Sequence, residues 1–154
     1  MWIKYQSAAQ TNMTVSATGT GGTPAGYLLQ VLVLTGANST QAGVTAGATN
    51  SSGSSTALQL AMTPGAAGNM VFGAAMNWAN STAPTLLAST SNQSTFSDTV
   101  NGDWYSSVKS SAVTTTSSTT FGYSTTLTGW QITLAEIQVS AGSALTRRSP
   151  VLAR

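Results

Sequence analysis

Two of the three acidic residues of this chain lie close together in the sequence. Asp98 and Asp103 flank the pair Asn101-Gly102 within the stretch SDTVNGDWYSSVK, residues 97–109. Asn-Gly between alternating segments predicts a β-hairpin with a two-residue type I′ turn, because both central positions need a positive φ. In that register the two carboxylates are diagonal neighbours on one face, within the range of glycosidase carboxylate pairs. A hairpin tip is wet and lacks the apolar pocket that raises one pKa, so the stretch favours a structural turn.

A serine-lysine motif follows the hairpin. Ser106 to Lys109 matches S-x-x-K, in which serine is the nucleophile of penicillin-binding enzymes. This chemistry needs both side chains on one face, and positions i and i+3 share a face on a helix but not on a strand. Because a strand is predicted here, we interpret the match as chance in a serine-rich chain.

The rest of the composition gives catalysis little support. There is no histidine and no cysteine, which removes the usual general base, the commonest metal ligand and any disulfide. Glu136 is the third carboxylate, and the three are too scattered for a hard-metal site. The Gly-rich stretch 19–26 has no lysine and precedes a predicted strand, unlike a phosphate-binding loop. We therefore expect no enzyme, no cofactor and no metal.

The aromatic residues are the remaining candidates for ligand contact. Most of the tryptophans and tyrosines lie at core-phase strand positions, so core packing is the main interpretation and a sugar-stacking platform the alternative. Trp104 lies near the predicted hairpin tip and out of phase with Tyr105. We expect Trp104 to be the exposed aromatic residue. In a ligand-binding domain, Trp104 and the loops 19–26 and 36–55 would form the contact surface.

The elements that position these residues are predicted to be strands throughout. Only 5% of the 154 residues are charged, and the abundant glycine and serine weaken helices. Apolar or alternating runs are separated by Gly, Ser, Asn and Pro clusters, as in an antiparallel sandwich. We predict one all-β, antiparallel, jelly-roll-like β-sandwich over residues 1–140 and an extended C-terminal arm over 141–154. The predicted strands cover residues 2–6, 13–18, 27–35, 56–62, 70–78, 86–90, 94–100, 103–109, 119–127 and 129–140, with a short edge strand around Val44.

Two of these runs carry a definite expectation about packing. Residues 27–35 are apolar on both faces, as in a central strand of a sandwich. Alternation in the run 70–78 places five side chains on one face: Met70, Phe72, Ala74, Met76 and Trp78.

The last run changes phase. Its residues alternate on one face from Trp130 to Leu134, whereas Ile137 and Val139 belong to the other face. A β-bulge near Ala135–Glu136 would return both to the core. Burial of the strand on both faces is the alternative.

Charge is confined to a few places. Three of the five cationic residues, Arg147, Arg148 and Arg154, lie near the C-terminus, and the net charge is +2. The almost neutral body lacks the basic surface of a nucleic-acid-binding protein. No apolar run approaches a membrane span, and Met1 is followed directly by a predicted strand instead of a secretory signal. We expect no nucleic-acid or membrane partner and synthesis in a cytoplasm.

Four stretches carry a resemblance to a known family. They are MWIKYQSAAQTNMTVSATG, YLLQVLVLTGAN, NMVFGAAMNWAN and GWQITLAEIQVSAGS. Together the pattern resembles the β-sandwich domain of tailed-bacteriophage virion proteins of the minor-tail and capsid-decoration type, which also occurs in some bacterial surface proteins. Family members carry further strands before the equivalent of WIKYQ, so we hypothesise that a neighbouring subunit covers the sandwich edge left exposed here.

The resemblance implies a non-enzymatic structural protein of the virion that decorates or cements the capsid or is attached to the tail. Its partners would be the major capsid or tail protein, in a homo-oligomer or in repeated copies on a shell. The alternative is a carbohydrate- or receptor-binding module with a host-surface glycan as ligand. The C-terminal arm would dock apolar side chains and pair its arginines with acidic groups; a solvated tail is the alternative. The expected partner contacts are Leu145, Arg147, Arg148, Val151, Leu152 and Arg154.

Overall fold

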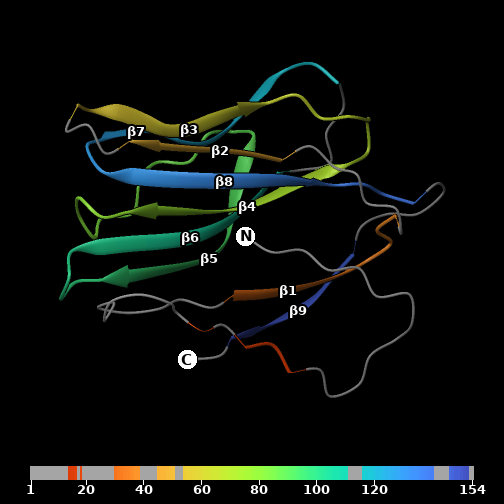
Figure 1. Cartoon of the computed structure of the whole chain (residues 1–154), viewed down its shortest axis with the longest axis horizontal. Coiled ribbons are helices and arrows are strands. Elements are labelled where there is room, and N and C mark those ends of the chain that lie inside the picture. Colours follow the sequence, from red (N-terminus) through yellow and green to blue (C-terminus); the bar gives the residue numbers. More distant parts are fainter. Residues whose placement is uncertain are drawn as a thin grey trace.

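The computed structural model describes residues 14–16, 18, 30–38, 45–50, 54–110, 116–140 and 146–152. Within these ranges every regular element is a strand, so no helix there could cross a membrane. The chain thus has the predicted all-β, antiparallel sandwich-like fold (Figure 1). The strands are β1 (Gln30–Thr35), β2 (Thr45–Asn50), β3 (Thr56–Met62), β4 (Met70–Asn77), β5 (Thr90–Asp98), β6 (Asp103–Ser110), β7 (Thr119–Leu127), β8 (Trp130–Ile137) and β9 (Thr146–Leu152).

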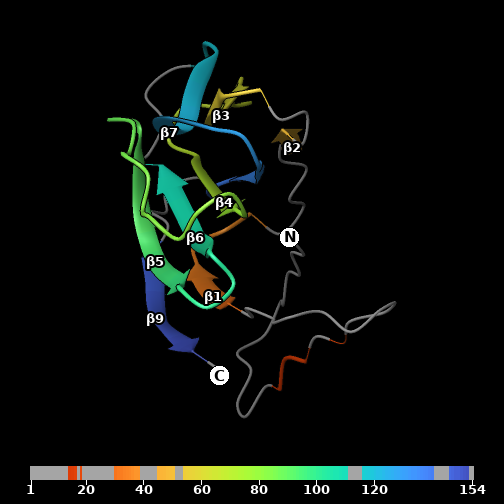
Figure 2. The same cartoon turned by 90° about the vertical axis from the view of Figure 1, so that its left-hand side faces the viewer.

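Two antiparallel sheets form the sandwich. The larger has the order β2-β8-β4-β6-β5, and the smaller pairs β3 with β7. Figure 2 shows β3 and β7 lying over one face of the larger sheet. The segment before β5 runs along the other edge of β7, where Leu87 N donates to Gly122 O (3.0 Å) and Ser124 N to Thr85 O (2.9 Å). The β7 edge is therefore covered by the chain itself.

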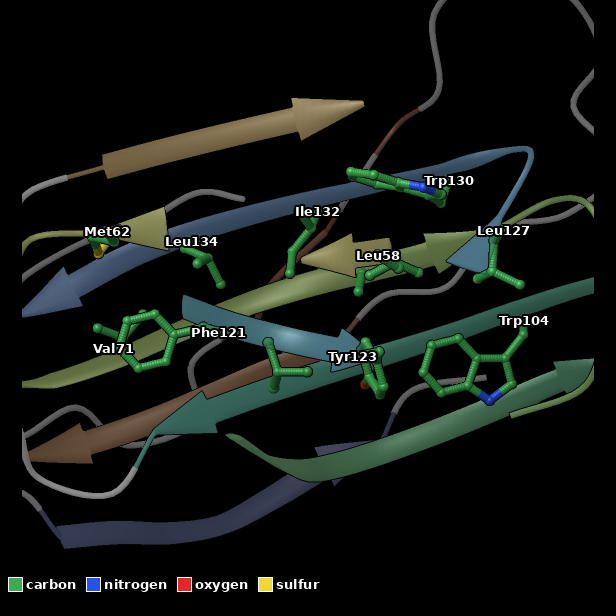
Figure 3. Close-up of a cluster of buried hydrophobic side chains, with 12 residues drawn as sticks. Leu58, Met62, Val71, Trp104, Phe121, Tyr123, Leu127, Trp130, Ile132 and Leu134 are labelled. Atoms are coloured by element: carbon green, nitrogen blue, oxygen red, sulfur yellow. The ribbon is translucent and has the colours of Figure 1, made fainter. Parts of the chain in front are cut away.

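The core lies between these two sheets. Trp104 of β6 meets Tyr123 of β7 edge to face, with ring centroids 5.1 Å apart (Figure 3). Burial of such large apolar side chains is the main driving force of folding. The buried cluster comprises Leu58, Met62, Val71, Ala75, Trp104, Val108, Phe121, Tyr123, Leu127, Trp130, Ile132 and Leu134.

Strand β8 is buried on both faces over its second half. The predicted core face from Trp130 to Leu134 is confirmed. The predicted β-bulge is wrong, because the pairing with β4 runs without a break from Met70–Ile137 to Asn77–Trp130. Ala135 and Ile137, on the opposite face, are also buried. The phase change of β8 therefore reflects burial on both faces, which is the alternative to the β-bulge.

Strand β4 alternates as predicted, and the face that meets β3 and β7 is the one opposite to the predicted five-residue set. Val71 and Ala75 belong to the buried cluster, whereas Met76 is half-buried and Ala74 is exposed. Met70, Phe72, Ala74 and Met76 thus point away from β3 and β7. Small side chains occupy the core face of β4 because large ones from β3, β7 and β8 fill the space above it.

Strand β1 is not the central strand that its apolar sequence suggests. In the described part of the chain it pairs only with β9, in a two-stranded ribbon. Figures 1 and 2 place this ribbon on the other side of the large sheet from β3 and β7. The segment after β1 joins the segment after β8, where Asn38 N donates to Gln138 O (2.8 Å) and Ser140 N to Gly36 O (2.9 Å). One end of the ribbon, where β1 stops at Thr35 and β9 starts at Thr146, therefore lies beside the end of β8.

Other predicted segments fall at the margins of the described residues. The predicted edge strand around Val44 corresponds to β2, which starts at Thr45. The predicted strand 2–6 lies outside the described residues. Of the predicted strand 13–18, residues 14–16 and 18 are described and are not in a strand.

Candidate functional site

The β5–β6 hairpin has a wider loop than its Asn-Gly pair predicts. Asp98 and Asp103 lie directly opposite each other, so four residues connect the strands instead of two. Gly102 has a φ of 76° and its N–H donates to Asp98 O (2.9 Å). The predicted two-residue turn, with the two carboxylates as diagonal neighbours, is therefore wrong. The observed register differs from the predicted one by an even number of residues. Each side chain therefore lies on the same face as the residues predicted to share it.

The side chain of Asp98 explains the wider loop. Its Oδ2 accepts a hydrogen bond from Asn101 Nδ2 (2.7 Å), and its Oδ1 accepts from the backbone N–H groups of Val100 (3.0 Å) and Asn101 (3.2 Å). Asp residues commonly hold turns in this way. These hydrogen bonds lower the pKa of Asp98, and the bond from the Asn101 side chain has the largest effect. A general acid at neutral pH needs a raised pKa, so Asp98 is a turn-holding carboxylate.

Asp103 is engaged by an aromatic neighbour. Tyr105 OH donates to Asp103 Oδ2 (3.0 Å), and burial together with this carboxylate raises the pKa of Tyr105. Across the ladder, Tyr105 pairs with Phe96, with ring centroids 6.3 Å apart and planes inclined by 35°. Two rings and two carboxylates therefore lie in adjacent rows at the hairpin end of the sheet.

Strand β4 extends both rows. Met76 pairs with Tyr105, so the first row runs Phe96, Tyr105, Met76 across three strands. Trp78 follows β4, and its backbone N–H donates to Gly129 O (3.0 Å), which continues the ladder. By alternation, Trp78 therefore shares the face of Met76. A side chain on Gly129 would lie 2.4 Å from Trp78 Nε1, so the indole lies against that glycine.

We call the six residues on this face the outer patch. Phe96 is 51% exposed and Trp78 39%, whereas Met76 and Tyr105 are half-buried. Single exposed apolar side chains are ordinary, but a contiguous group rimmed by polar residues marks an interaction site. The outer patch consists of Met76, Trp78, Phe96, Asp98, Asp103 and Tyr105.

The predicted exposure of Trp104 is wrong. Trp104 is 1% exposed and packs on Tyr123 in the core, so it is not a ligand contact. As predicted, Trp104 and Tyr105 lie on opposite faces of β6, but Tyr105 is the residue that faces outward. Val108 shares the face of Trp104, whereas Ser107 shares the face of Tyr105. That difference in polarity is the sequence signal that assigns the two faces correctly.

The S-x-x-K motif lies on β6, a strand, as predicted. Ser106 faces the core, where its Oγ lies 2.6 Å from Tyr123 OH. Alternation places Ser107 on the outer face, where its buried Oγ has no hydrogen-bond partner in the described structure. Positions i and i+3 of a strand belong to opposite faces by the same rule. The geometry thus contradicts a serine-lysine pair of the kind the motif would require.

The third carboxylate, Glu136, is 1% exposed and lies far along the sheet from the hairpin. Its Oε1 accepts from Gly65 N (2.8 Å) and Asn69 Nδ2 (2.6 Å), and Asn69 Oδ1 accepts from Val139 N (3.1 Å). Glu136 and Asn69 therefore tie the β3–β4 loop to the end of β8. Among the described residues, no three Asp or Glu side chains gather as a metal site would require.

The C-terminal candidates stay predictions. Four of them belong to β9 and lie opposite β1, Arg148 opposite Val33 and Arg147 opposite Leu34, and Val151 and Leu152 opposite Val31 and Gln30. Leu145 and Arg154 lie outside the described residues, as does the loop 19–26.

Comparison with protein-family models, with curated proteins and with solved structures found no match to this chain.

Proposed function

We propose that the chain is a non-enzymatic structural protein of a tailed-phage virion, bound to neighbouring shell subunits as a capsid decoration or cement, or attached to the tail. The observation that carries the proposal is the β1–β9 ribbon. Its two strands pair with each other and, in the described part of the chain, with no third strand. An isolated pair of strands is marginally stable, so such a ribbon gains most when a further surface covers it.

The residues of the ribbon suit a protein partner. Val31 and Leu34 of β1 are half-buried, and β9 contains two arginines together with Val151 and Leu152. Adding a strand to an open edge supplies main-chain hydrogen bonds, and alternate side chains supply specificity. In this proposal the C-terminal arm, residues 141–154, engages an adjacent subunit, and copies of the chain repeat on a shell or form a homo-oligomer.

A jelly-roll-like connectivity belongs to the same proposal. β8 lies between β2 and β4, and β3 lies beside β7, so several neighbouring strands are far apart in the sequence. Such long connections are typical of Greek-key and jelly-roll sandwiches. They place segments from both halves of the chain side by side, which suits a protein that resists mechanical stress in a particle.

A carbohydrate- or receptor-binding module on a phage or bacterial surface is the second candidate function. The outer patch favours it, in place of the buried Trp104. Exposed aromatic rings beside carboxylates are a common arrangement for recognising polar ligands with apolar faces.

Size-exclusion chromatography with light scattering tests the first function. We expect the 154-residue chain to form a closed oligomer, and the variant lacking residues 141–154 to be a folded monomer by circular dichroism. Phe96→Ala, which changes the outer patch and leaves the ribbon intact, is the matched control and should keep the oligomer. A full-length chain that is a folded monomer at all concentrations would contradict the role given to the ribbon.

A further inference from the structure

We propose that the outer patch binds a neutral oligosaccharide. This inference deepens the second candidate function and rests on it, and it is independent of the β1–β9 ribbon. It follows from three features of the patch: its rings, its carboxylates and its charge.

The rings provide a stacking surface. Phe96 and Tyr105 lie side by side on adjacent strands with their planes inclined by only 35°. Met76 continues this row on β4. The face of an aromatic ring is electron-rich, so it attracts the weakly positive C–H groups on the apolar face of a pyranose. Because a sheet holds these side chains in fixed register, the surface is formed before any ligand binds.

The carboxylates provide acceptors for sugar hydroxyls. Asp98 and Asp103 occupy the next row, directly opposite each other. Asp103 accepts one hydrogen bond, from Tyr105 OH (3.0 Å), through one of its two oxygens. A carboxylate has about four acceptor positions, so Asp103 retains capacity for ligand O–H donors. Hydrogen bonds to a charged acceptor are about twice as strong as neutral ones. Tyr105 thus stacks on a ligand and orients the carboxylate beside it.

The charge of the patch selects among possible ligands. Two carboxylates repel phosphates, uronic acids and sialic acids, so the expected sugar carries no negative charge. The same charges disfavour a second copy of the chain on this face. A twofold contact would bring the Asp98–Asp103 pairs of both copies together. Like charges brought together at an interface are strongly unfavourable. A neutral ligand rich in O–H donors meets neither penalty.

The experiment is isothermal titration calorimetry of the full chain with cellohexaose, mannohexaose, maltohexaose and chitohexaose, with sialyllactose as the anionic probe. We expect at least one neutral hexasaccharide to bind and sialyllactose not to bind. Phe96→Ala and Tyr105→Ala should each weaken binding by about tenfold or more, since one stacked ring supplies that much affinity. The matched control is Leu86→Ala. Leu86 is 37% exposed on the segment paired with β7, and its removal should change the affinity less than about twofold.

The outcomes separate this inference from the proposals it accompanies. Circular dichroism of each variant establishes that loss of binding is not loss of folding. If none of the neutral hexasaccharides binds, or if Phe96→Ala and Tyr105→Ala bind as the unchanged chain does, the inference is wrong. If these two variants instead dissociate an oligomer, the patch is a contact between copies and the inference is again wrong. The oligomeric state of the variant lacking residues 141–154 bears only on the ribbon. Each of the two proposals can therefore be contradicted without the other.

Discussion

Trp104 of β6 and Tyr123 of β7 meet edge to face across the interior of the sandwich, 5.1 Å between ring centroids. This contact joins the two sheets and also fixes which face of the β5–β6 hairpin lies outward. The hydroxyl of Tyr123 also makes polar contacts with β5 and β6. It lies 2.6 Å from Ser106 Oγ and donates to Asn92 Oδ1 at 2.5 Å. Burial raises the pKa of Tyr123, so the hydroxyl stays neutral and keeps its proton for this bond.

Tyr123→Phe should lower the free energy of unfolding by about 1–3 kcal/mol, because Ser106 and Asn92 lose a buried hydrogen-bond partner while the ring contact is kept. Chemical denaturation followed by tryptophan fluorescence measures this. The matched control is Tyr105→Phe, which removes a hydroxyl at the surface and should change stability by less than about 0.5 kcal/mol. Equal effects at the two tyrosines would show that the buried network contributes nothing special.

The loop between β3 and β4 should depend on Glu136. Asn69→Ala removes the donor to Glu136 Oε1 (2.6 Å) and the acceptor for Val139 N (3.1 Å). We expect it to cost about 1–3 kcal/mol of stability, because buried polar partners are left unpaired. Glu136→Ala should cost a similar amount, and the double variant less than the sum of the two, since both residues belong to one network.

Amide hydrogen exchange gives this prediction a local measurement. The Gly65 N–H donates to Glu136 Oε1 (2.8 Å), so its exchange should accelerate in Glu136→Ala more than that of core amides in β8. Strictly additive stability changes, or an unchanged Gly65 exchange rate, would contradict the view that Glu136 holds the β3–β4 loop to the end of β8.

The sequence predicts strand periodicity well because alternation is a local property of the chain. The all-β class, the core face from Trp130 to Leu134 and the hairpin around Asn101 all follow from it. Which face meets the core is a property of the partner sheet, and this is where the sequence misleads. Trp104 lies on the inner face because β7 places Tyr123 above it. The polarity of the neighbouring residues in β6 indicates this face, but the residue that covers Trp104 comes from another strand.

Two further departures have specific causes. The hairpin loop has four residues because the Asp98 carboxylate binds two backbone N–H groups within it, which outweighs the preference of Asn-Gly for a two-residue turn. The outer patch is assembled from three strands, and Met76 comes beside Tyr105 only through the β4–β6 pairing. Such long-range registers cannot be predicted from one local pattern.

The hairpin loop also allows a prediction about pH. Hydrogen bonds from Asn101 lower the pKa of Asp98, so the folded state binds a proton there less readily than the unfolded chain does. This stabilising contribution is therefore present above the unfolded pKa and is lost as the pH falls through the lower, folded pKa. Asn101→Ala removes the side-chain donor, which is the largest cause, and should raise the pKa of Asp98 toward its ordinary value.

NMR titration of the side-chain carboxyl carbons measures this pKa directly. Thermal unfolding adds a second measurement, since the stability difference between the unchanged chain and Asn101→Ala should shrink at strongly acidic pH. Asn80→Ala, a change outside the hairpin, is the control and should leave the pKa of Asp98 where it is. An Asp98 pKa that does not respond to Asn101→Ala would show that the backbone N–H groups alone hold it down.

Gly122 in β7 should tolerate no side chain. Its φ is 117°, and an added Cβ would lie 2.5 Å from the carbonyl oxygen of Leu58 on β3 and 3.1 Å from Ile132 Cδ1 in the core. Gly122→Ala therefore combines backbone strain with a steric clash, and strain alone costs about 1–3 kcal/mol. Gly68 is the matched control, because its φ is 90° and an added Cβ there meets nothing within 4 Å. Gly68→Ala should show the strain without the clash, so the melting temperature should fall distinctly further in Gly122→Ala. Equal losses in the two variants would mean that β3 yields to the added methyl group, and the close approach of β3 to β7 would then not be a rigid feature of the sandwich.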